Sequence, residues 1–81
     1  ERRRRRGPGA QERELAKIEN ELARVAERKT EVEAMLADPS HYGEPGALEA
    51  LAEEHATFAG RIADLEERWE ALAAEIEALS A

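Results

Sequence analysis

Residues 48–79, LEALAEEHATFAGRIADLEERWEALAAEIEAL, decide the fold of this chain. Ten of them recur in unbroken three-four spacing, which places them at the a and d positions of a heptad repeat on one helix. So narrow an apolar stripe is not stable alone in water and needs a second helix to cover it. The ten are Leu48, Leu51, His55, Phe58, Ile62, Leu65, Trp69, Leu72, Ile76 and Leu79.

The first half of the chain supplies the second helix, because the same spacing recurs there. Its a and d residues are Leu15, Ile18, Leu22, Val25, Lys29, Val32 and Leu36. Between the two halves lies DPSHYGEPG, residues 38–46, whose two prolines and two glycines interrupt a helix. We therefore expect an all-α fold, a two-helix antiparallel coiled-coil hairpin over residues 10–81. The helices should span about 11–37 and 45–80, with a loop at 38–44 and a basic flexible linker at 1–9.

Charges beside the stripe predict how the two helices align. In an antiparallel pair the g positions of one helix face the g positions of the other. Slipping the second helix by one heptad would set Arg28 against Arg61, so the like charges disfavour that register. The expected register instead brings three pairs of opposite sign together, namely Glu14 with Arg68, Glu21 with Arg61, and Arg28 with Glu54.

Composition restricts the chemistry of the chain. It has 81 residues and no cysteine, so disulfides and thiolate metal sites are excluded. No apolar run approaches the roughly 20 residues of a membrane span. The two histidines are too few and too far apart for a metal site, and no catalytic constellation is present. We expect no enzymatic activity, no cofactor, no metal, no membrane contact and a cytoplasmic location. Because the chain begins at Glu1 rather than methionine, we also expect a longer parent protein.

Basic residues are the candidates for nucleic-acid binding. The net charge is −7, with +4 in residues 1–10 and therefore −11 in the rest. An acidic rod does not attract phosphates by its overall field, so any contact needs a local basic patch. The alternative is a mixed-charge solvent face, since glutamates stand beside these cations. The candidates are Arg2, Arg3, Arg4, Arg5 and Arg6 in the tail, and Arg13, Lys17, Arg24 and Arg28 on one side of the first helix.

Three apolar residues are candidates for partner docking. In the expected register Leu72, Ile76 and Leu79 lie opposite residues 1–8, beyond the expected start of the first helix. An uncovered apolar stripe indicates a dimer or a partner. The two polar residues in the stripe, Lys29 and His55, are interpreted as determinants of register rather than as a chemical site.

Residues 36–72 resemble the C-terminal domain of Uup-type ABC-F ATPases. The resemblance is carried by Ala37-Asp38-Pro39, by Tyr42 in the loop, and by Leu65-Glu66-Glu67-Arg68-Trp69 near the end of the long helix, and it extends over about residues 10–80. It implies a coiled-coil hairpin that follows two tandem ATP-binding cassettes without transmembrane segments. It also implies a ribosome-associated parent ATPase, a hairpin associated with DNA binding, and contact with the upstream ABC domains. The expected partner is thus DNA or RNA, ribosomal RNA included.

Two other functions remain open at this point. The first is a structural hairpin that dimerises or docks onto the ATPase cassettes through its second helix, without binding nucleic acid. The second is a helical arm of an unrelated enzyme, such as a tRNA-binding hairpin of a synthetase. Salt-dependent binding to DNA or RNA would support the nucleic-acid-binding function. A mass that rises with concentration would support the structural hairpin.

Overall fold

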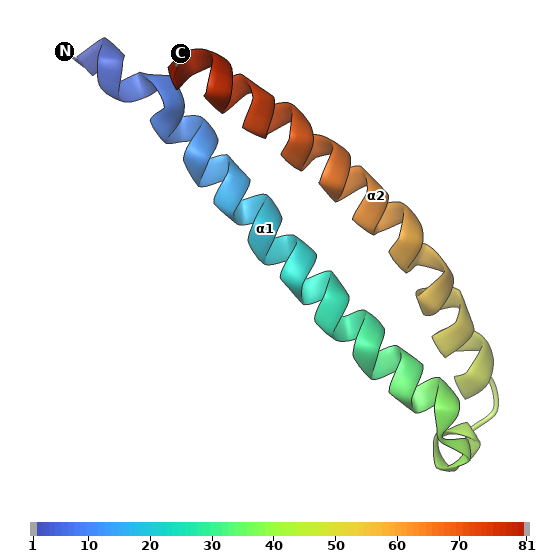
Figure 1. Ribbon diagram of the computed structural model, residues 1–81. Helices are drawn as coiled ribbons and strands as arrows, with labels where there is room; N and C mark the ends of the chain where they lie inside the picture. The colour runs from blue at the N-terminus through green and yellow to red at the C-terminus, as the bar shows by residue number, and fades with distance from the viewer. Residues whose placement is uncertain (1, 81) are drawn as a thin grey trace.

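The chain folds into one antiparallel pair of long helices. The computed structural model describes the backbone of residues 2–80 and the side chains of residues 9–40 and 43–80. The helix α1 spans Arg2–Ala37, a short 3-10 helix η1 spans Pro39–Tyr42, and α2 spans Ala47–Ser80. Figure 1 shows α1 and α2 side by side, with the start of α1 and the end of α2 at the same end of the molecule. The molecule is a rod of 61 × 17 × 15 Å. The predicted all-α hairpin is confirmed.

The first helix begins earlier than the sequence predicted. We expected a start at about Gln11, after a linker that Gly7-Pro8-Gly9 would keep out of the helix, but α1 begins at Arg2. Arginine is a good helix former, and the arginine tract continues α1 although Pro8, beyond its first turn, costs one backbone hydrogen bond and crowds the carbonyl four residues earlier. The helix therefore passes through the glycines and the proline. The flexibility of residues 1–9 stays a prediction.

The turn between the helices is built by local hydrogen bonds. Asp38 is the N-cap of η1, and its side chain accepts a hydrogen bond of 3.0 Å from the backbone N–H of Ser40. The chain then reaches Gly46, whose φ of 82° lies in the left-handed region that glycine adopts without strain. The backbone N–H of Ala50 donates to the carbonyl of Gly46, which starts α2 two residues later than the predicted Pro45.

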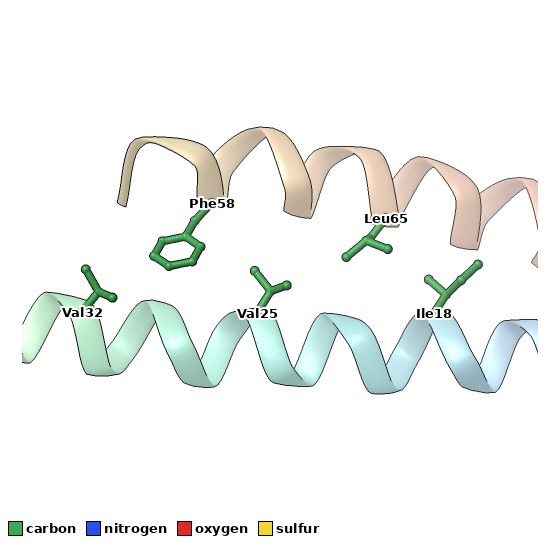
Figure 2. Packing of buried hydrophobic residues seen from close by; sticks show 5 residues of the cluster. All are labelled: Ile18, Val25, Val32, Phe58 and Leu65. Atoms are coloured by element: carbon green, nitrogen blue, oxygen red, sulfur yellow. The ribbon is translucent and has the colours of Figure 1, made fainter. Parts of the chain in front are cut away.

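The core is a single row of side chains between the two helices. Five residues are buried, Ile18, Val25 and Val32 from α1 and Phe58 and Leu65 from α2. Figure 2 shows them alternating between the helices and pointing toward one another. All five occupy d positions of the heptad.

The a positions are less buried than the d positions. Leu22, Ile62 and Trp69 pack against the core but remain partly exposed to solvent. On a helix the d position adjoins g and the a position adjoins e. The two helices are therefore in closest contact toward their g sides, while the side that carries the a and e residues is more open.

Candidate nucleic-acid and partner-binding surfaces

One predicted ion pair joins the helices at the centre of the g side. The Nε and Nη2 atoms of Arg28 donate to the two carboxylate oxygens of Glu54, at 2.6 and 2.9 Å, and Nη1 donates to Glu31 at 3.1 Å. These hydrogen bonds raise the pKa of Arg28 above its ordinary range. The bond from Arg28 also lowers the pKa of the Glu54 carboxyl. A bidentate contact of this kind favours the one alignment of the two helices that places Arg28 opposite Glu54.

Of the other two predicted ion pairs, one is present in the structure and one is not. Arg61 lies 3.8 Å from Glu21, as the predicted register requires. Glu14 forms no ion pair with Arg68 in the part of the chain that the structure describes, and lies 3.8 Å from Lys17 instead. Lys17 is three residues away on the same helix, so a local contact replaces the cross-helix one.

The basic candidates divide into three groups. Arg13, Lys17 and Arg24 are exposed on α1. Arg28 is only partly exposed and is held by two carboxylates, so it is less available to an external phosphate. The side chains of Arg2–Arg6 lie outside the described residues. The arrangement thus leaves three exposed cations on the described part of α1.

The e side of α1 carries two cross-helix contacts that the sequence analysis missed. The ring of His55 is hydrogen-bonded to Glu33 at 3.0 Å, and Trp69 Nε1 donates to Glu19 at 2.9 Å. The bond with His55 lowers the pKa of the Glu33 carboxyl. Both contacts join an e position of α1 to an a position of α2, two heptads apart. These contacts were missed because e positions were paired only with e positions. Glu19 and Glu33 are fourteen residues apart, as are His55 and Trp69, and this equal spacing could have indicated the two contacts.

The polar residues of the stripe serve as structural contacts. His55 stacks its ring edge-to-face on Phe58, with centroids 5.9 Å apart. Lys29 is partly buried and its charge contributes to the lowered pKa of Glu33. Among the described residues, no three histidines, aspartates or glutamates are placed to hold a metal ion. Lys29 and His55 therefore contribute to the packing and the register of the two helices.

The predicted docking residues are covered to different degrees. Leu72 packs against the core, Ile76 is partly exposed, and Leu79 is 49% exposed. All three were expected to be uncovered because the first helix was expected to begin only at about residue 11. Since α1 continues to Arg2, it runs beside this end of α2, and Gln11 donates a hydrogen bond of 2.9 Å to Glu75 there.

Trp69 separates two open hollows on the a and e side. The first, of about 380 Å³, is lined by Leu22, Glu66, Trp69 and Glu70. The second, of about 570 Å³, lies over the alanines and Ile76 of the next two turns of α2. Trp69 is thus a seam residue, as predicted from its a position, but with an open hollow on each side.

These features define an all-α protein module, a two-helix antiparallel hairpin with a charged surface. The chain belongs to the ABC transporter C-terminal domain family, whose model matches residues 9–80. The predicted identity as the C-terminal accessory domain of an ABC protein is thereby confirmed. No curated protein and no solved structure matched the chain. Neither helix has, in the described part of the chain, an apolar stretch long enough to cross a membrane.

Proposed function

We propose that this hairpin is the C-terminal accessory domain of a Uup-type ABC-F ATPase and contacts nucleic-acid phosphates through the N-terminal half of α1. The observation that carries the proposal is the exposure of Arg13, Lys17 and Arg24 on the helix that continues from the arginine tract. The resemblance over residues 36–72 supports the Uup type, the cytoplasmic location and the link to ribosomes. ATP hydrolysis belongs to the cassettes of the parent protein, and the hairpin has no catalytic role.

Electrostatics restricts how such a contact forms. Residues 11–81 carry a net charge of −11, which repels phosphate at long range. At physiological ionic strength, screening reduces this repulsion beyond about 8 Å. A local contact by exposed cations is therefore feasible, while the glutamate faces stay turned away. Sequence preference should be small, because phosphate contacts carry no base information.

The test is a titration of labelled duplex DNA and of structured RNA at low and at moderate salt. The variant Arg13→Gln/Arg24→Gln should weaken binding and flatten the salt dependence. Its matched control is Arg61→Gln/Arg68→Gln, which removes the same charge from α2 and should bind more tightly than the α1 variant. Each lost phosphate contact reduces the salt slope by about 0.9.

Deletion of residues 1–9 measures the contribution of the arginine tract. We expect this deletion to cause the larger loss of affinity, because it removes five adjacent cations. The proposal is wrong if the whole chain binds neither nucleic acid at low salt. Equal losses in the α1 variant and its α2 control would instead show that only total charge matters.

The exposed end of α2 favours a second candidate function, docking of the hairpin onto another protein surface. Leu79 is 49% exposed and Ile76 is partly exposed on the same helix. Self-association through this end predicts a mass that rises with concentration, whereas docking onto the ATPase cassettes predicts a monomeric hairpin. Sedimentation of the whole chain over a hundredfold concentration range distinguishes the two.

A further inference from the structure

The two hollows beside Trp69 form a groove with a fixed aromatic ridge. The indole N–H is held by Glu19, so the ring is anchored across the helix pair. On one side of the ring lies Leu22 of α1, and on the other lie Ala73 and Ala74 of α2. Small side chains leave room there for the side chains of another molecule. We call these two hollows and the ring between them the Trp69 groove.

The spacing of the groove suits a helix. Glu66 lines the first hollow and Ala73, seven positions further along α2, lines the second. At a rise of 1.5 Å per residue, Glu66 and Ala73 are about 10 Å apart along α2. Two apolar side chains at positions i and i+7 of a partner helix have the same separation. Packing of an amphipathic helix into such a groove is a common mode of peptide recognition.

The described charged residues that line the groove are all acidic. Glu66 and Glu70 line the first hollow, and Glu70 and Glu77 border the second. None of the described residues that line either hollow is basic. The rim is complementary to lysine or arginine on the flanks of a partner, and the open faces of the indole can accept a cation.

We propose that the Trp69 groove binds a basic amphipathic helix of a partner protein, with two apolar side chains beside the indole and cations on the glutamate rim. The proposal rests on the docking role given above as the second candidate, and it adds the chemistry of the partner. The proposed docking is independent of nucleic-acid binding, because the glutamates that line the groove repel phosphate and the proposed phosphate contacts lie elsewhere, on α1. A second copy of the hairpin fits poorly, because its groove would set glutamate rim against glutamate rim.

The single tryptophan provides the assay. The probe is a 14-residue peptide of leucine at helical i, i+3 and i+7 spacing with lysine on the flanks. We expect a saturable blue shift of Trp69 emission on titration into the whole chain. A peptide of the same pattern with glutamate in place of lysine should bind at least tenfold more weakly.

A pair of charge variants tests the location of binding. Glu70→Lys/Glu77→Lys reverses two charges at the groove, and Glu53→Lys/Glu67→Lys reverses two exposed charges elsewhere on α2. The net charge of the two variants is the same. We expect the groove variant to lose at least tenfold in affinity for the lysine peptide relative to the control variant. Circular dichroism should show equal helix content in both.

A neutral substitution tests the shape of the groove. Ala73→Gln fills the second hollow without changing charge, and Ala71→Gln adds the same side chain at an exposed site outside it. The first should weaken peptide binding at least fivefold and the second less than twofold.

Three results would overturn the proposal. One is equal loss of affinity in the groove and control charge variants, which would indicate attraction to an acidic rod. Another is peptide binding without a change in Trp69 emission. The third is a blue shift that appears with rising protein concentration alone, which would assign the groove to a second copy. Loss of nucleic-acid binding in the α1 variant would leave the proposal unaffected, because neither Arg13 nor Arg24 lines the groove.

Discussion

Truncation of Phe58 should destabilise the hairpin more than truncation of the larger Trp69. Phe58 is 1% exposed and points into the row of buried residues between the helices, as Figure 2 shows. Its removal leaves an enclosed void that is bounded by Val25 and Val32 of the facing helix. Trp69 lies between two open hollows, so solvent enters the space that it leaves.

The expected losses in the free energy of unfolding have two components, the transfer of the removed atoms to water and the cavity that they leave. Loss of a buried phenylalanine includes the transfer of its atoms and the cavity that remains, about 3–5 kcal/mol together. Because two helices can move together more easily than a thick core, we expect about 3 kcal/mol for Phe58→Ala. For Trp69→Ala the cavity term is absent, and about 2 kcal/mol is expected. The whole domain should be stable by roughly 4–12 kcal/mol, from about 0.05–0.15 kcal/mol per residue.

Urea unfolding followed by circular dichroism at 222 nm measures both losses without a fluorescent probe. The variant Phe58→Leu serves as the control, because it keeps most of the buried volume and should cost less than half as much as Phe58→Ala. A cost below about 1 kcal/mol for Phe58→Ala would refute the packing described here. So would a larger loss for Trp69→Ala than for Phe58→Ala, since that would require the indole to be enclosed.

Three further predictions concern the ion pair and the turn. Arg28→Glu should lower the melting temperature, and adding Glu54→Arg should restore part of it because the pair is rebuilt with its charges exchanged; no recovery would show that the contact does not hold the register. The lowered pKa of Glu54 implies stability that is present above its ordinary value of 4.5 and is lost as pH falls through the folded-state value. Glu54→Gln should therefore show a shallower loss of melting temperature between pH 5 and pH 3 than the parent chain, and equal slopes would contradict the assignment. Gly46→Ala should cost about 1 kcal/mol because its φ is 82°, whereas Gly60→Ala, in an open part of α2, should stabilise by about 0.5–1 kcal/mol; urea unfolding of both variants is the measurement.

The register shows how far the sequence could be read. The g-position charges predicted Arg28 opposite Glu54 and Arg61 opposite Glu21, and both contacts are present. The third pair is absent because Glu14 has a basic neighbour one turn away on its own helix. Long charged side chains choose among several partners of similar energy, so a heptad pattern indicates which pairs are possible and not which of them form.

The Trp69 groove was beyond sequence reasoning for a different reason. The heptad placed Trp69 in the seam, but a heptad treats a and d positions as equivalent. All five buried residues are d residues, whereas a residues such as Leu22, Ile62 and Trp69 stay partly exposed, and this asymmetry opens the groove. The contacts from Glu19 and Glu33 to α2 follow from the same rotation of the helices.

The sequence by itself determined the two helices, their antiparallel pairing and the place of the turn, because spacing, prolines and flanking charges are local properties of the chain. Only the tertiary structure decided where α1 begins, which edge of the pair is closed, and which side chains flank Trp69. These depend on how the two helices rotate about their axes. That rotation is the outcome of all side chains packing at once, with van der Waals contacts summed over the whole 61 Å rod.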